Sequence, residues 1–258
     1  MRSKSKIIVI VSSLLVLCFA EDELKRLRSG FAAHGNDEKI NYILMDYELQ
    51  DVMINGQTFK KPTIPFGGLN AEEGEPVLPT VTTFYQVAPN KSYNIKVNIQ
   101  SSEIFENIDI VPHQTWDPVT GETTVPFKRN TDLYTSDEPF PKKQASISQI
   151  IVFRDLPVVK VSFTPFRYRP LSRQLEIITS ADIDLVETGN IEPVQIPSRR
   201  SRVFEPLYES IVVNYNRSVS DEDYQKPSIL YILPSNSSNL MSNLDILFEW
   251  RHKSGYVV

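Results

Sequence analysis

The sequence predicts a mainly β protein, an antiparallel β-sandwich followed by the beginning of an α/β domain. Between residues 40 and 190, short segments of alternating apolar and polar residues are separated by turn residues about every 8–12 positions, as is typical of sandwiches. After residue 228 an apolar run, a helical pattern and a second apolar run follow one another, which indicates a strand–helix–strand unit.

Composition limits the classes of partner that the chain can bind. The chain has 258 residues, of which 41% are hydrophobic, enough to form a real core. Its formal net charge is −5, and it becomes −8 without Arg2, Lys4 and Lys6. A chain this acidic is not expected to bind nucleic acid or acidic lipid through its overall charge.

The first 20 residues have the layout of a secretory signal peptide. A basic start precedes an apolar run of 13 residues, Ile7–Phe19, and Ala20 stands before the acidic Glu21. The run is too short for a spanning helix. We therefore expect residues 1–20 to be cleaved on export, which gives a secreted or cell-surface protein with no stable membrane span. An uncleaved anchor is the alternative.

Cysteine and histidine usage argues against several kinds of catalytic or metal site. Cys18 is the only cysteine, so the expected mature chain has neither a disulfide nor a cysteine nucleophile. His34, His113 and His252 are not at ligand spacing from one another, so we predict no metal site and no cofactor.

We divide the chain into five segments. Residues 21–39 are charged and are expected to form a poorly ordered lead-in, and residues 40–195 are expected to form the sandwich. Asn55-Gly56 between apolar runs is a strong hairpin signal, because both central residues of the favoured turn need positive φ. The strands predicted after this hairpin are Thr80–Val87, Tyr93–Gln100, Ile108–Val111, Gln149–Phe153, Val158–Phe163, Phe166–Arg169, Leu175–Ile178 and Ile183–Val186.

A rigid loop precedes the first long strand. Prolines fix φ, remove backbone donors and push the preceding residue towards extended geometry. For Glu75 we expect only a local hydrogen bond to the backbone. The loop consists of Gly74, Glu75, Pro76, Val77, Leu78 and Pro79.

The least regular internal stretch is Pro112–Lys143, and loops of this length are often functional. Its basic pair, Lys128 and Arg129, is either a surface charge pair or part of a binding loop. Its aromatic residues either form a ligand-binding platform or pack the loop onto the sandwich. These aromatic residues are Trp116, Tyr134 and Phe140.

Residues 196–227 are predicted to be a linker with a possible processing site. Arg199, Arg200 and Arg202 form a basic, polar run, and exposed runs between domains are where proteases cut. A solvated linker is the alternative. We interpret Phe204–Tyr215 as part of this linker.

Residues 228–258 are expected to begin an α/β domain. Ile229–Leu233 is a continuous apolar run of the kind found in strands buried on both faces. A helix is predicted to follow, with Gly255 suited to its end. A domain that ends at Val258 could not bury this helix, so we expect the chain to be a fragment or a truncated frame. The helical stripe consists of Leu240, Leu244, Leu247 and Arg251.

Several motifs together resemble the N-terminal propeptide of gingipain-type cysteine peptidases over roughly residues 40–258. The Gly74–Pro79 loop after an Asn-Gly hairpin is the first. The second is the run from Phe163 to Pro170. Ser201–Tyr208 with Asn214-Tyr215 is similar to the family's junction, and Ile229–Val258 to the start of its caspase-like peptidase domain. Within the second motif we single out Pro165, Tyr168 and Pro170.

The resemblance implies a β-sandwich propeptide that chaperones a cysteine peptidase and occludes its active-site cleft until cleavage, in cis or in trans. The family's catalytic Cys and His would lie beyond Val258, so the chain alone is expected to be an inactive part of a zymogen. Lys128 or Arg129 could then fill the specificity pocket of the peptidase. The alternative is a secreted β-sandwich module for adhesion or carbohydrate binding.

Overall fold

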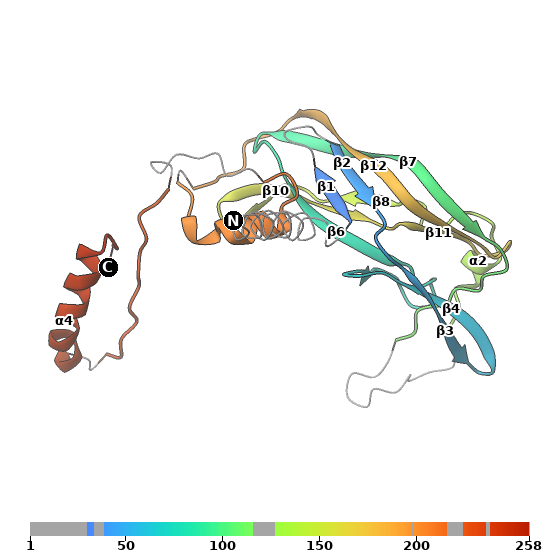
Figure 1. Ribbon diagram of the computed structural model, residues 1–258, viewed down its shortest axis with the longest axis horizontal. Coiled ribbons are helices and arrows are strands. Elements are labelled where there is room, and N and C mark those ends of the chain that lie inside the picture. The colour runs from blue at the N-terminus through green and yellow to red at the C-terminus, as the bar shows by residue number, and fades with distance from the viewer. Residues whose placement is uncertain are drawn as a thin grey trace, which may run out of the picture.

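The computed structural model describes residues 30–33, 39–115, 127–197, 199–215, 224–235 and 238–257. The predicted signal peptide, with Cys18, lies outside the described residues. Figure 1 shows a β body that holds most of the strands, with the C-terminal helix α4 standing apart from it.

The first sheet is antiparallel and is organised around one long strand. This strand, β12, pairs along one edge with β7 and along the other with β11 and then β2, and β1 pairs with β2. The strands are β1 (Phe31–Ala33), β2 (Lys39–Ile43), β7 (Lys91–Phe105), β11 (Phe166–Arg169) and β12 (Gln174–Asn190).

The second sheet is also antiparallel, in the order β5-β6-β10-β8, with β9 paired to β10. Its strands are β5 (Gly68–Leu69), β6 (Pro79–Gln86), β8 (Ala145–Ile147), β9 (Ile151–Phe153) and β10 (Leu156–Phe163). Along β6 buried and less buried residues alternate, so this strand turns one face to the core. In β10 the first four residues are all buried, and alternation begins only after Val159.

The main core lies between the two sheets, which confirms the predicted sandwich. Tyr42 of β2 packs edge-on against Phe163 of β10, with ring centroids 4.8 Å apart. Phe31 of β1 also packs against Tyr42, with ring centroids 5.3 Å apart. The remaining buried residues of this core come from both sheets: Ile40, Val81, Tyr85, Val87, Ala145, Val159, Val161, Ile178, Ala181, Ile183 and Leu185.

A separate hairpin projects from the body (Figure 1). It consists of β3 (Glu48–Ile54) and β4 (Gln57–Thr63). Asn55 and Gly56 have φ of 52° and 78°, as the Asn-Gly signal predicted. Phe59 of β4 is buried with Val77 and Val111 and so ties the hairpin to the Gly74–Pro79 loop.

Within the β body, three predictions of local structure were wrong. Phe31–Ala33 was expected in the lead-in but forms β1, because Phe31 has a place in the core. Leu175–Ile178 and Ile183–Val186 are one strand that continues through register shifts near Ser180. Ile108–Val111 is not a strand, although Ile110 makes an isolated bridge to Lys60.

The chain after β12 contains more helix than we predicted. η1 (Arg202–Phe204) and α3 (Glu205–Ile211) form where a linker was expected, and a short helix, α2 (Thr131–Tyr134), lies in the long irregular stretch. The predicted C-terminal helix is present as α4 (Ser238–Lys253). In the part of the chain that the structure describes, none of the helices is long and apolar enough to cross a membrane.

The segment Ile229–Leu233 is not the buried strand that we predicted. It runs beside α4 with Leu230 85% exposed, and a bridge between Ser228 and Val257 joins the two ends of this unit. A strand needs a neighbouring strand to satisfy its backbone groups, and the residues described around Ile229–Leu233 provide only that bridge.

Candidate functional site

The Gly74–Pro79 loop lies between two other segments of the body. The Gly74 N–H donates to the His113 carbonyl at 2.7 Å, and the His113 N–H donates to the Glu75 carbonyl at 2.7 Å. On its other side, the Asn130 N–H donates to the Gly74 carbonyl at 3.0 Å. The Gly74–Pro79 loop is therefore the middle one of three hydrogen-bonded segments, with His113 on one side and Asn130 on the other. We call these three segments the three-segment support.

The proline positions fit this arrangement. Pro76 makes an antiparallel bridge with Pro112, and Val77 donates to the Val111 carbonyl at 2.9 Å. Pro79 begins β6 and Leu78 is buried. Glu75 accepts a local hydrogen bond from the Glu72 N–H at 2.9 Å, which is the role that we expected for it.

The second family motif packs beneath the same support. Phe166 and Tyr168 of β11 are fully buried together with Leu78. The Tyr168 hydroxyl donates to the Ile108 carbonyl at 2.9 Å. Pro165 and Pro170 flank β11, and the Pro165 carbonyl accepts from the Ile178 N–H at 2.7 Å. The two motifs that we singled out thus form one structural unit.

Side chains hold together the two segments that flank residues 116–126. The Gln114 side chain pairs with the Lys128 backbone as a neighbouring strand would: its Nε2 donates to the Lys128 carbonyl at 2.7 Å, and its Oε1 accepts from the Lys128 N–H at 2.9 Å. Glu73 accepts from the Thr115 hydroxyl and from Lys128 Nζ, the latter at 2.5 Å. We call Glu73, Gln114, Thr115 and Lys128 the stem.

The stem has a distinct electrostatic character. The hydrogen bonds from Lys128 and then from Thr115 lower the pKa of the Glu73 carboxyl below its usual value. Half of the Lys128 side chain is exposed although it is ion-paired. The Arg129 guanidinium stacks on the Tyr134 ring, 3.9 Å from its centroid. Both predicted basic residues therefore have partners that hold the stem in place.

The predicted aromatic platform is not assembled from Tyr134 and Phe140. Tyr134 is buried and donates its hydroxyl to the Ile110 carbonyl at 3.1 Å. Phe140 exchanges backbone hydrogen bonds with Tyr168, both at 2.8 Å, and its side chain packs against the core beneath the loop. Trp116 lies outside the described residues. The alternative in which these rings pack the loop down is therefore correct for Tyr134 and Phe140.

In the basic run after the sandwich, Arg199 is exposed, whereas Arg200, Ser201 and Arg202 contact other parts of the chain. The Arg200 carbonyl accepts from the Gln225 N–H at 2.8 Å, and the Arg202 guanidinium lies 4.6 Å from the centre of the Tyr224 ring. Between them, the Ser201 N–H donates to Asp155 Oδ2 at 2.7 Å.

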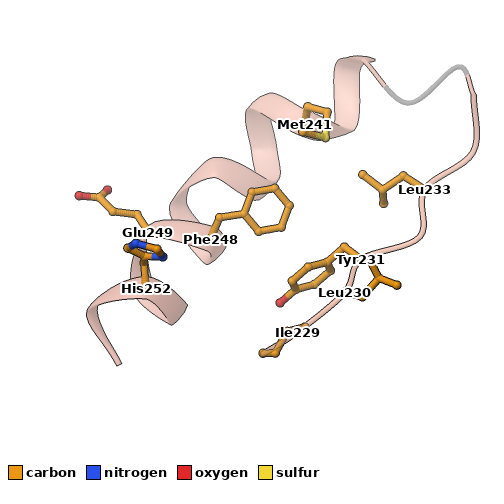
Figure 2. Close-up of a pocket in the computed structure, with 8 residues that line it drawn as sticks. All are labelled: Ile229, Leu230, Tyr231, Leu233, Met241, Phe248, Glu249 and His252. Carbon is orange, nitrogen blue, oxygen red and sulfur yellow. The ribbon is translucent and has the colours of Figure 1, made fainter. Parts of the chain in front are cut away.

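The C-terminal unit has an open apolar cavity of about 730 Å³. Figure 2 shows Tyr231 turned towards Phe248 of α4. These two rings are in contact, with centroids 4.9 Å apart. The residues that line the cavity are Ile229, Leu230, Tyr231, Leu233, Met241, Phe248, Glu249 and His252.

No cluster of His, Cys, Asp and Glu that could hold a metal ion is found among the described residues. Sequence reasoning missed Glu73, Gln114 and Asp155. Each acts on a residue far away along the chain, so no local pattern could have identified them.

Comparison with known proteins places these features in a family context. A family model described as Propeptide_C25 matches residues 24–220. Gingipain R2 of Porphyromonas gingivalis is 22% identical over 232 residues, which are 87% of this chain and 31% of that protein. Gingipain R1 of the same organism is 22% identical over 228 residues, which are 84% of this chain and 22% of that protein. The chain thus spans about a third or less of the length of these relatives.

Two solved structures share the fold. One is the complex of the pro- and mature domains of P. gingivalis RgpB, with a TM-score of 0.61 and 21% identity over 73% of this chain and all of that one. The other describes the zymogenic latency of gingipain K from P. gingivalis, with a TM-score of 0.50 and 18% identity over 62% of this chain and 91% of that one. At these identities the likeness establishes the fold.

Proposed function

Because the chain belongs to the Propeptide_C25 family of gingipain-type propeptides, we propose that it chaperones and inhibits a cysteine peptidase domain. Inhibition consists of occlusion: the rigid β body covers the active-site cleft until proteolysis removes it. The partner is the cognate peptidase domain, in cis or in trans. An N-terminal signal peptide directs the protein to the secreted or cell-surface location.

The observation that carries this proposal is the stem. It holds Gln114, Thr115 and Lys128 in fixed positions on the three-segment support around Gly74. Groups that are already held in place lose less conformational entropy when they bind. The described residues of this stretch can therefore contact a cleft with little reorganisation, which is what an inhibitor needs. The two solved structures of similar fold support this proposal, since one is a complex of pro- and mature domains and the other concerns zymogenic latency.

Lys128 and Arg129 have two possible roles in this mechanism. Either one inserts into the specificity pocket of the peptidase, or both act by positioning the loop that inserts. The contacts of Lys128 with Glu73, and of Arg129 with Tyr134, favour the positioning role. Insertion would require these contacts to break first.

The test is inhibition of the mature domain of gingipain R2 by the intact chain, measured with a fluorogenic peptide substrate. We expect the chain to lower the rate in a dose-dependent way. If the stem positions the loop, Glu73→Gln and Lys128→Met each weaken inhibition by roughly two- to fivefold, because both side chains are partly exposed and an exposed ion pair contributes at most about 1 kcal/mol.

The pair of variants separates the two roles. If Lys128 itself inserts, Lys128→Met abolishes inhibition, while Glu73→Gln leaves it unchanged or improves it by freeing the lysine. Asp51→Asn is the control, since Asp51 pairs with Lys60 on the projecting hairpin at 2.7 Å. An unchanged peptidase rate at saturating chain, with the relative's own prodomain active in the same assay, would contradict the proposed function.

We further propose that maturation includes cleavage in the run that contains Arg199, Arg200 and Arg202. The exposure of Arg199 at the end of the extended segment before it supports this proposal, because exposed linkers are preferred sites of proteolysis.

A further inference from the structure

Residues Ser201–Asn214, which we call the strap, complete the open edge of the second sheet. On one side β6 pairs with β10, and on the other β5 covers only its first two residues. Further along that side, Val212 bridges Phe84, and the Val213 N–H donates to the Phe84 carbonyl at 2.9 Å. An added segment of this kind satisfies an edge that would otherwise expose unpaired backbone groups.

The Asn214 side chain extends this pairing by one more position. Its Oδ1 accepts from the Gln86 N–H at 2.7 Å, and its Nδ2 donates to the Gln86 carbonyl at 3.0 Å. The amide thereby makes both bonds that a strand residue would make with β6.

Apolar contacts hold the middle of the strap. Tyr208 and Val212 are buried against Leu156 and Val158 of β10. The ring of Phe153, which belongs to β9 of the same sheet, packs against both Tyr208 and Phe84, with its centroid 6.1 Å from that of Tyr208 and 5.9 Å from that of Phe84. Burial of this kind makes the main contribution to the stability of a docked segment.

A buried carboxylate holds the N-terminal end of the strap. Asp155 is only 5% exposed and lies in the turn between β9 and β10. Its Oδ2 accepts from the Ser201 N–H at 2.7 Å, and its Oδ1 accepts from the Tyr208 hydroxyl. Both of these donors belong to the strap, and a buried carboxylate that loses its donors is strongly destabilised.

We propose that the strap remains bound to the β body after cleavage in the basic run, with Asp155 as its anchor. The inference builds on the proposed maturation. Cleavage at Arg199 or Arg200 leaves the contacts of Asn214, Val212, Tyr208 and Asp155 in place. Such a cut therefore nicks the chain without separating its two products, and dissociation of the strap becomes a distinct later step.

Cleavage between Arg200 and Ser201 would strengthen the anchor. Hydrolysis adds one water across this bond, so Arg200 ends as a carboxylate and Ser201 begins with an amine that takes up a proton. The nitrogen that now donates to Asp155 as a neutral amide would then be an ammonium beside a buried carboxylate. Charge-assisted hydrogen bonds are roughly twice as strong as neutral ones.

The test uses the full chain with an inserted recognition sequence for a specific protease. One variant is cut before Arg199 and another before Ser201. After cutting, size-exclusion chromatography under native conditions measures whether the products elute together. We expect co-elution for both, and about tenfold slower dissociation for the chain cut before Ser201.

Asp155→Asn is expected to speed dissociation about tenfold or more. Asp137→Asn is the matched control, since Asp137 also accepts from a serine backbone N–H, that of Ser172 at 3.1 Å, away from the strap. If Asp155→Asn fails to fold, Asn214→Ala tests the other end of the strap and is also expected to speed dissociation.

Immediate separation of the wild-type products would overturn the proposal, and so would equal dissociation of the wild-type, Asp155→Asn and Asn214→Ala chains. This assay contains no cysteine peptidase, so its outcome is independent of whether the intact chain inhibits one. Failure of the inhibitory function would appear only in the peptidase assay.

Discussion

Gly74 is subject to two separate constraints at one backbone position. Its φ is +86°, and a Cβ placed there would lie 2.9 Å from Asn130 N and 3.2 Å from the Arg129 carbonyl carbon. Both neighbouring atoms belong to the backbone and cannot rotate away. Position 74 therefore requires glycine for two reasons: the positive φ, and the close approach of the 129–130 backbone.

We expect Gly74→Ala to lower the free energy of unfolding by roughly 1–3 kcal/mol, because strain in φ and the contact with the 129–130 segment add together. Gly56→Ala is the control, since Gly56 has φ of +78° but no atom within 4 Å of the added Cβ. It carries the conformational cost alone, about 1 kcal/mol. Denaturant unfolding of both variants gives the difference. Equal losses would show that the contact with Asn130 relaxes without cost.

For single residues, the sequence predicts the backbone conformation better than it predicts which distant residue is contacted. The two prolines of the Gly74–Pro79 loop and the Asn-Gly turn act on their own dihedral angles, so their effects can be read locally. The pairing of Gln114 with Lys128 and of Asp155 with Ser201 joins residues 14 and 46 positions apart. Nothing near any of these residues in the sequence indicates its partner.

Among the elements, the basic run shows how docking can direct proteolysis. Arg199 is exposed, whereas the next peptide group is held at both ends: the Arg200 carbonyl by Gln225 and the Ser201 N–H by Asp155. Proteolysis is favoured where the backbone of the cleaved bond is exposed and is not held by hydrogen bonds. The bond after Arg199 is therefore expected to be cut before the bond after Arg200.

Replacing Arg199, Arg200 and Arg202 together with Ala is expected to leave the chain uncut between residues 199 and 203 when it is treated with the mature domain of gingipain R2. Fragment masses measure the position of the cut, and a time course measures its rate. Replacing the exposed pair Lys142 and Lys143 with Ala is the control and should not slow this cut. Cleavage of the triple variant at the same position and rate would contradict the proposed processing site.

Element boundaries were predictable where one face of a strand is buried. β6 and β11 lie within a residue or so of their predicted ranges, since their alternation reflects burial on one face. β12 appeared as two strands because its shifts in register near Ser180 interrupt the pattern. The strap was predicted to be a linker because a helix of seven residues is too short to show a helical repeat in the sequence.

For the molecule as a whole, tyrosine makes an unusual contribution to the core. Tyr42 lies between the two sheets, Tyr134 and Tyr168 lie beneath the Gly74–Pro79 loop, and Tyr208 packs the strap against β10. Burial is the main cause that raises the pKa of each of these phenols above its usual value of 10.0. In Tyr208, the hydrogen bond to Asp155 adds to this effect.

These raised pKa values predict that the protein loses stability in alkali. Above a pH of about 10 the phenols ionise in the unfolded chain but stay neutral in the folded one, so the unfolded state binds fewer protons. Stability is thus fully present below this pH and falls above it. Each phenol that stays neutral contributes about 1.4 kcal/mol per pH unit to the slope.

Denaturant unfolding between pH about 9 and about 11 measures this slope, and tyrosinate absorbance of the folded protein shows whether the phenols remain neutral. Lysines titrate in the same range, so the tyrosine share is isolated with Tyr134→Phe. This variant loses the bond to the Ile110 carbonyl and is expected to be less stable at neutral pH, yet to have a shallower slope above pH about 10 because it has one fewer phenol to protect. An unchanged slope in Tyr134→Phe would mean that Tyr134 ionises within the fold, and that the core beneath the loop is open to water.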